Sequence, residues 1–289
     1  MRSRNPPVAG TRTTLSLSVS NVSVLTRGSF GEGRGQWLFQ ARRGYLDLLL
    51  ALTDNDEIDA IDEEISPKYF DVFGKVQYQI GTNHRLAAHV LYAGDNLTFV
   101  DPEARVESTW SSAYGWLTWD AVYDRLSVTT MAFGGGLDRV REGGIDNEFA
   151  ILGPNFLFLE DRRDFRFGGV KQDVRVDLGE RLLLKLGAEA KRLEADYDYF
   201  SETRQIMVCP SGLVGNASDT VDFDLDPSGS EVAGYLAARV RPVDPLTAEI
   251  GMRYDRVSHT DDSDVSPRLL TAFQLDDATT LRASWGRYY

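Results

Sequence analysis

The histidines are the first candidates for catalytic or metal-binding residues. The three histidines are His84, His89 and His259, and no HExxH, GxSxG or CxxC motif accompanies them. His84 and His89 are five residues apart, which places them on opposite faces if the segment is a strand. The histidines therefore indicate neither a catalytic pair nor a metal site, and we expect no catalytic residue and no enzyme.

An acidic run, a glycine-rich run and one cysteine are the other candidates. Residues 54–64 hold seven carboxylates without a basic residue. Such a run is typical of a solvated loop, but oxygen-rich loops also suit Ca²⁺, so metal binding there stays open although EF-hand spacing is absent. Residues 133–138, FGGGLD, leave a strand and open no helix, which argues against a phosphate site. Cys209 is the only cysteine in the sequence and so has no disulfide partner in the chain. None of these motifs indicates a bound cofactor, and we expect none.

Composition excludes several classes of protein. The chain has 289 residues, is 42% hydrophobic and 26% charged, and carries a net charge of −13. This is enough for a sizeable core, but the acidic balance argues against nucleic acid, whose phosphates need a basic face. No run approaches the roughly 20 apolar residues of a spanning helix, so any membrane role must come from strands. The first residues contain no recognisable signal peptide.

Period-two alternation is the main structural signal. In residues 70–80, Val76, Tyr78 and Ile80 share one parity, while Lys75, Gln77 and Gln79 share the other. Comparable pairs of alternating runs flank short turns at residues 27–35, 81–83, 123–125, 179–181, 241–245 and 276–279. These pairs predict six hairpins and about twelve antiparallel strands, an all-β fold.

Long polar segments separate the predicted hairpins. They are residues 53–66, 95–111, 136–161, 195–229 and 256–264. Short and long connections alternate, as in a transmembrane β-barrel with short periplasmic turns and long extracellular loops. We therefore expect residues 195–229, with Cys209 and the acidic cluster Asp219, Asp222, Asp224 and Asp226, to form an extracellular loop.

A barrel would place each set of side chains in a different environment: the lumen, the lipid or the two membrane interfaces. Lys75, Gln77 and Gln79 are expected to face the lumen, and Val76, Tyr78 and Ile80 are expected to face lipid. Aromatic side chains near strand ends are expected to form interfacial girdles; they are Tyr92, Trp119, Tyr123, Tyr254, Trp285 and Tyr288.

Several segments resemble the barrel of TonB-dependent outer-membrane receptors. Residues 41–50, ARRGYLDLLL, and 66–95, SPKYFDVFGKVQYQIGTNHRLAAHVLYAGD, are similar to the first half of that barrel. Residues 248–257, AEIGMRYDRV, and 265–289, VSPRLLTAFQLDDATTLRASWGRYY, resemble a mid-barrel segment. Residues 182–199, LLLKLGAEAKRLEADYDY, resemble the strand before a large external loop. The resemblance begins at about residue 11.

The resemblance implies a function and a division of the chain. It implies a 22-stranded barrel with an amino-terminal plug that imports a scarce ligand, such as a siderophore or another nutrient, with energy delivered through the TonB complex. We expect residues 1–10 to be unstructured and residues 11–289 to be a partial barrel without the plug, continuing beyond Tyr289. The expected location is the bacterial outer membrane, with lipid, lipopolysaccharide and a small-molecule ligand as partners. A self-contained small outer-membrane pore and a soluble β-rich binding module remain the alternatives.

Overall fold

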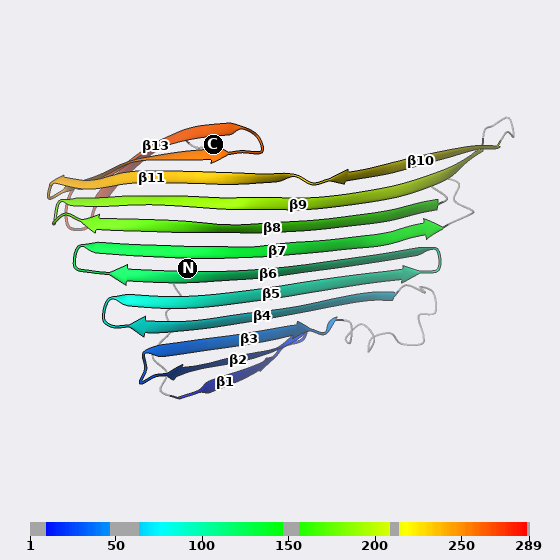
Figure 1. Cartoon of the computed structure of the whole chain (residues 1–289), viewed down its shortest axis with the longest axis horizontal. Coiled ribbons are helices and arrows are strands. Elements are labelled where there is room, and N and C mark those ends of the chain that lie inside the picture. The colour runs from blue at the N-terminus through cyan, green and yellow to red at the C-terminus, as the bar shows by residue number, and fades with distance from the viewer. Residues whose placement is uncertain (1–9, 47–63, 147–155, 209–213, 288–289) are drawn as a thin grey trace.

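The residues that the structure describes fold into one antiparallel sheet of 14 strands. The strands lie side by side in a broad, curved sheet (Figure 1). The computed structural model describes residues 10–46, 64–146, 156–208 and 214–287. No helix within these ranges is long and apolar enough to cross a membrane. The strands are β1 (Arg12–Leu17), β2 (Asn21–Phe30), β3 (Gly35–Gly44), β4 (Glu64–Ile80), β5 (His84–Asp101), β6 (Ala104–Val122), β7 (Leu126–Asp146), β8 (Phe156–Asp177), β9 (Leu182–Val208), β10 (Val214–Leu225), β11 (Ser228–Val243), β12 (Leu246–Val257), β13 (Asp262–Gln274) and β14 (Thr280–Gly286). The predicted all-β antiparallel fold is confirmed.

Pairing follows sequence order except at β10. Strands β1 to β9 and β11 to β14 each pair with the next strand on this path, and β10 pairs with β9 alone. β9 has 27 residues, and pairs with β11 through its first half and with β10 through its second half. β10 and β11 therefore follow each other along the same edge of β9 (Figure 1).

The prediction of about twelve strands was too low. Five predicted hairpins are present as β4/β5, β6/β7, β8/β9, β11/β12 and β13/β14. The sixth, predicted around residues 27–35, holds three strands rather than two, because Asn21–Phe30 forms β2 between β1 and β3. β10 lies within a segment that was predicted to be a loop. The two strands that were not predicted, β2 and β10, are rich in polar residues or glycine. This composition obscures the alternation of apolar and polar residues.

Most of the predicted long loops are strands. β5 ends at Asp101 and β6 begins at Ala104, so residues 95–111 form the end of a hairpin. Residues 195–229 are also mainly strand, because β9 and β10 pair from Tyr197–Leu225 to Val208–Val214. In these extensions polar residues replace apolar ones on the apolar face, so the sequence lacks the period of a half-buried strand. Residues 54–63 and Cys209 lie outside the described residues.

Tight turns close the opposite end of the sheet. Gly81 begins the β4/β5 turn with a positive φ of 62°. Glycine adopts this backbone conformation readily because it has no Cβ. The β13/β14 turn is held by Asp276, whose Oδ1 accepts hydrogen bonds from the backbone N–H groups of Ala278 and Thr279, each at 2.8 Å. This is the local side-chain cap that favours aspartate in turns.

The two faces of the sheet differ in chemistry. We call the face that bears Val76, Val90 and Leu117 the apolar face, and the face that bears Lys75 and His89 the polar face. Apolar-face side chains are exposed although hydrophobic: Val76, Ile80, Val90, Leu117, Trp119, Val170, Leu186, Val232, Leu236, Ile250, Met252 and Leu269. Polar-face side chains such as Lys185 and Glu189 are half-buried. This is the reverse of the arrangement in a water-soluble sheet.

The exposed hydrophobic side chains form a belt of limited height. It runs from the tight turns to a row of directly paired residues, Tyr92, Ala113 and Gly136. Beyond that row, polar residues replace apolar ones on the same face, beginning with Asn96 on β5 and Asp138 on β7. The longest strands therefore have an apolar lower part and an upper part that is polar on the apolar face as well.

Candidate functional site

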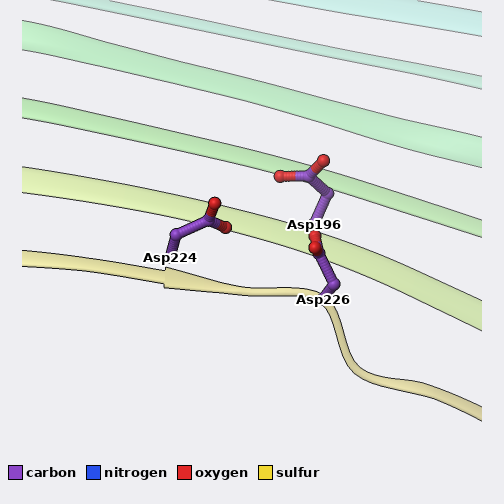
Figure 2. Close-up of side chains that lie close together, drawn as sticks. All are labelled: Asp196, Asp224 and Asp226. Carbon is purple, nitrogen blue, oxygen red and sulfur yellow. The ribbon is translucent and has the colours of Figure 1, made fainter.

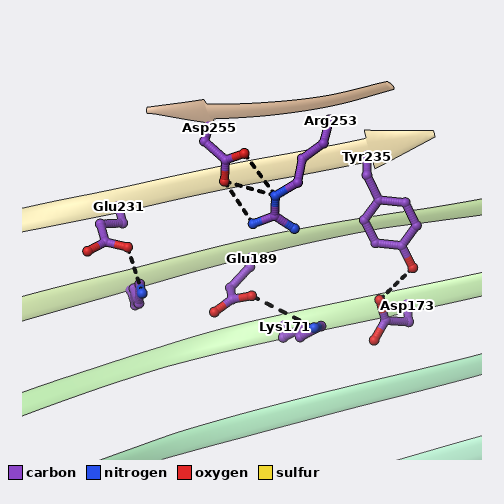
Figure 3. A network of polar contacts seen from close by, with 8 residues as sticks. Lys171, Asp173, Glu189, Glu231, Tyr235, Arg253 and Asp255 are labelled. Atoms are coloured by element: carbon purple, nitrogen blue, oxygen red, sulfur yellow. Dashed lines mark hydrogen bonds and ion pairs between the residues drawn. The ribbon is translucent and has the colours of Figure 1, made fainter. Parts of the chain in front are cut away.

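A set of polar contacts extends across the polar face of β8, β9, β11 and β12 (Figure 3). They comprise Lys171 to Glu189 at 3.9 Å, Lys191 to Glu231 at 2.6 Å, the Tyr235 hydroxyl to Asp173 at 2.7 Å, and Arg253 to Asp255 at 2.8 Å within β12. Lys171 pairs directly with Glu189, and Lys191 pairs directly with Glu231, so these side chains lie about 5 Å apart on one face. Tyr235 instead reaches Asp173 across Gly187 of β9, the residue with which both are paired. The sequence parity predicted this charged face but not the partners.

Glu249 is the centre of a second group on this face. Its side chain is only 7% exposed and lies 2.7 Å from Lys185 Nζ and 2.9 Å from an Nη of Arg239. Arg268 adds a third cation at 3.8 Å. A carboxylate this buried needs such partners, because desolvation alone would disfavour its charged form. The group therefore links β9, β11 and β12 near the tight turns.

Asp161 is the centre of a third group, in the upper part of the sheet. Its side chain is fully buried, with Arg141 at 2.5 Å and Arg163 at 2.8 Å. Burial alone would raise the pKa of the Asp161 carboxyl, but hydrogen bonds from Arg163 and Arg141 lower that pKa below its usual range. Arg163 also donates to the Tyr197 hydroxyl at 2.9 Å.

Aromatic rings interrupt the polar face between these charged groups. His89 stacks on Trp116 with centroids 4.7 Å apart, and Phe73 contacts both rings. A second set on β6, β7 and β8 consists of Tyr114, Phe133, Phe165 and Phe167. A Cβ at Gly169 would lie 2.8 Å from the Phe133 ring and 2.6 Å from the Ala190 carbonyl oxygen. Glycine is therefore required where the Phe133 ring crosses β8.

A hollow of about 520 Å³ lies on the polar face directly above the aromatic rings. It spans β5 to β8, and its lining residues are Asp95, Leu97, Ser108, Trp110, Leu137, Arg139 and Arg163. The volume falls in the range of small-molecule pockets, and the mixture of apolar and charged groups suits an orienting site. This hollow is the best candidate for a ligand site on the described part of the polar face.

The apolar face carries an acidic group above the hydrophobic belt (Figure 2). Asp196, Asp224 and Asp226 are exposed, and each offers a carboxylate oxygen within 4.8 Å of the others. Repulsion by Asp226, with smaller effects of burial, Asp196 and Asp198, raises the pKa of the Asp224 carboxyl. Oxygen ligands of this kind suit Ca²⁺ or Mg²⁺. Asp224 and Asp226 belong to the acidic cluster predicted from the sequence, whereas Asp196 joins them through the β9/β10 pairing.

The histidines do not meet, as expected from their spacing. His84 faces the apolar side, where it stacks on Trp119 at 5.8 Å and its Nε2 lies 3.2 Å from the Tyr123 hydroxyl. His89 faces the polar side, and His259 lies beside Gly229 near the other end of the sheet. Residues 133–138 lie inside β7 and open no loop, which corrects the expectation that this run leaves a strand.

Sequence reasoning missed the aromatic rings and the hollow on the polar face. Phe73 has the same parity as Lys75 and Gln77, so the sequence does mark it as an aromatic residue on a polar face. The hollow has no such signal, because its residues come from four strands. Only the register places Asp95, Trp110 and Arg139 side by side.

Comparisons with known proteins agree on one architecture. The family described as TonB dependent receptor-like, beta-barrel matches residues 16–289. A search of curated proteins gave no match. The fold is similar to the ferric yersiniabactin uptake receptor FyuA from Yersinia pestis, with a TM-score of 0.61 and 12% identity over 96% of this chain and 45% of that protein.

Two further solved structures show the same relationship. The outer membrane transporter YddB from Escherichia coli has a TM-score of 0.63 and 12% identity over 93% of this chain and 38% of that one. FpvAI in its complex with pyocin S2 has a TM-score of 0.69 and 11% identity, over 97% of this chain and 43% of that one. The chain therefore spans less than half the length of these three structures.

Proposed function

Because the chain belongs to the TonB dependent receptor-like β-barrel family, we propose that it forms part of the wall of an outer-membrane receptor that takes up a scarce ligand such as a siderophore or another nutrient. The printed titles of FyuA and YddB, an uptake receptor and an outer membrane transporter, support this kind of function. The barrel region in this proposal is residues 11–289.

The separation of chemistry between the two faces carries the proposal. On the apolar face of β5 the belt covers residues 84–92, close to the roughly 9–11 residues that a tilted strand needs to cross a bilayer. Aromatic contacts lie at both edges of the belt: His84 and Trp119 near the turns, and Phe70 with Tyr92 at 6.3 Å at the upper edge. The apolar face is then the lipid face, and the polar face lines the lumen.

The proposal includes partners and a location. The belt would contact outer-membrane lipid, and the polar upper part of the same face would lie at the level of lipopolysaccharide. Coupling to the TonB complex would be supplied by a plug outside this chain. The polar face, with its ion pairs, would line a hydrated route for the ligand, and we propose no catalytic role for it.

The two alternatives are disfavoured by specific observations. Within the described residues β1 and β14 each pair with a single neighbour, and no pairing joins them, whereas a self-contained barrel would close at these edges. A soluble module would bury its large apolar side chains, yet Val90 is 59% exposed and Ile250 is 60% exposed. A larger barrel accounts for both features.

Expression of the protein from its complete gene tests the proposal in two steps. The protein should fractionate with outer membranes and migrate differently in a gel with and without heating, as a folded barrel does. Its presence should then support growth on a limiting nutrient, a ferric siderophore or another nutrient such as a short peptide, only when TonB is intact. A protein found in the aqueous fraction without detergent would contradict the barrel proposal. Growth that is independent of TonB would contradict the receptor proposal.

A further inference from the structure

Four residues that line the hollow above the aromatic rings occupy one row of the sheet. Asp95 of β5 pairs directly with Trp110 of β6, Trp110 with Arg139 of β7, and Arg139 with Arg163 of β8. All four face the same side and line the same hollow of about 520 Å³. The row lies beyond the belt of the apolar face, so it belongs to the part of the wall that emerges from the membrane.

Two charges in this row lack partners within the described chain. Arg163 is occupied by Asp161 and Tyr197. The side chains of Asp95 and Arg139 make no ion pair or hydrogen bond with any residue that the structure describes, although most charged side chains near them on this face are paired. They do not pair with each other because β6, carrying Trp110, lies between them. Two strand spacings separate their backbones, about 10 Å.

We propose that this hollow binds a zwitterionic ligand of short-peptide length, with its cationic group at Asp95 and its anionic group at Arg139. This inference rests on the proposed receptor function and names the class of ligand that the receptor recognises. A chain of about three residues spans roughly 10 Å, which matches the separation of the two strands that carry Asp95 and Arg139. The Trp110 ring and Leu137 would pack against the apolar middle of the ligand.

The arrangement disfavours ligands with one kind of charge. A simple anion at Arg139 would leave Asp95 unpaired in the same hollow, and a simple cation at Asp95 would leave Arg139 unpaired. A neutral ligand would leave both charges desolvated without partners, which costs free energy. Only a ligand with both charges, separated by an apolar middle, satisfies Asp95, Trp110 and Arg139 together.

Equilibrium binding of a labelled tripeptide tests the inference. The protein is expressed from its complete gene, and outer membranes are dialysed against tritiated Ala-Leu-Ala. Unlabelled Ala-Leu-Ala, its N-acetyl form and its C-terminal amide compete for the site. We expect saturable binding of the free peptide and about tenfold or greater weakening when either terminus is blocked, because each block removes one charge-assisted contact.

Matched variants assign each terminus to its residue. Arg139→Gln should weaken the free peptide to the level of the amide and leave the amide unchanged. Asp95→Asn should weaken binding of the free peptide to the level of the acetylated peptide and leave binding of the acetylated peptide unchanged. Arg175→Gln, on the same face of β8 near the tight turns, is the control and should change nothing.

Three outcomes would overturn the inference: no saturable binding to the wild-type protein, equal binding of free and blocked peptides, or equal weakening of all three peptides by the Asp95 and Arg139 variants. TonB-dependent growth without tripeptide binding would reject this ligand and leave the receptor function standing. Absence of the protein from the outer membrane would reject the receptor function itself.

Discussion

Arg163 binds both carboxylate oxygens of Asp161, with Nε at 2.8 Å and an Nη at 3.1 Å, from two residues further along the same face of β8. Arg141 on β7 binds the same carboxylate from the neighbouring strand. Asp161 therefore links β7 to β8 in the upper part of the sheet, above the belt.

Replacement of Asp161 tests the importance of this group. We expect Asp161→Ala to lower the free energy of unfolding by about 1–3 kcal/mol, because two guanidinium groups lose a buried partner. Both arginines are partly exposed, and this keeps the loss moderate. Urea unfolding in lipid vesicles measures the loss. Glu107→Gln is the control, since its contact with Arg105 is 3.8 Å long and exposed, and it should change stability by less than about 0.5 kcal/mol.

The lowered pKa of Asp161 predicts how this contribution depends on pH. A carboxyl whose pKa is lower in the folded state stabilises that state fully above its usual pKa of 3.8. The contribution is lost as pH falls through the lower pKa of the folded state. The difference in unfolding free energy between wild type and Asp161→Ala should therefore be constant above about pH 5 and shrink below pH 3.8. A difference that grows on acidification would contradict the assignment.

Two adjacent glycines of β8 should respond differently to the same substitution. A Cβ at Gly169 would lie 2.6 Å from the Ala190 carbonyl oxygen and 2.8 Å from the Phe133 ring, whereas at Gly168 the nearest atom is 3.8 Å away. We expect Gly169→Ala to cost about 1–3 kcal/mol of stability and Gly168→Ala to be close to neutral. The same urea titration compares them. Equal effects would show that the aromatic rings do not pack against β8 as described.

Neighbouring residues of β6 should differ in their tolerance of a charge. Leu117 lies within the belt of the apolar face, and Thr118 lies on the polar face. Leu117→Lys should destabilise the folded protein by about 2–4 kcal/mol if it enters the middle of the bilayer. Thr118→Lys should have little effect, because in the proposed barrel its side chain would face the hydrated lumen. The fraction of each variant that migrates as the folded form in an unheated gel measures the effect of the substitution. A similar loss of folded protein in both variants would contradict the face assignment.

The sequence was informative wherever one face of a strand is apolar. The alternation of Val76, Tyr78 and Ile80 with Lys75 and Gln77 predicted β4 and its two faces, because a strand with lipid on one side must keep period two. Five hairpins followed from the same signal, and their turns lie where the sequence placed them.

The prediction from sequence was wrong where the apolar face of a strand becomes polar above the belt. Residues 95–111 and 195–229 lack the alternation there and therefore predict loops, although β5, β6, β9 and β10 continue through them. Contacts such as Asp161 with Arg141, and the row of Asp95, Trp110 and Arg139, depend on register between strands. Register is set by pairing of the whole sheet, and no local pattern shows it.

Spin-label accessibility along β4 tests the central claim, that one face of this sheet meets lipid and the other a hydrated lumen. Cys209 is first replaced by serine, and single cysteines are then introduced by Lys75→Cys, Val76→Cys, Gln77→Cys and Tyr78→Cys and labelled with a nitroxide. In outer-membrane lipid, positions 76 and 78 should collide more with oxygen, and positions 75 and 77 more with a water-soluble nickel chelate. The reverse pattern, or no alternation between adjacent positions, would contradict the assignment of the two faces.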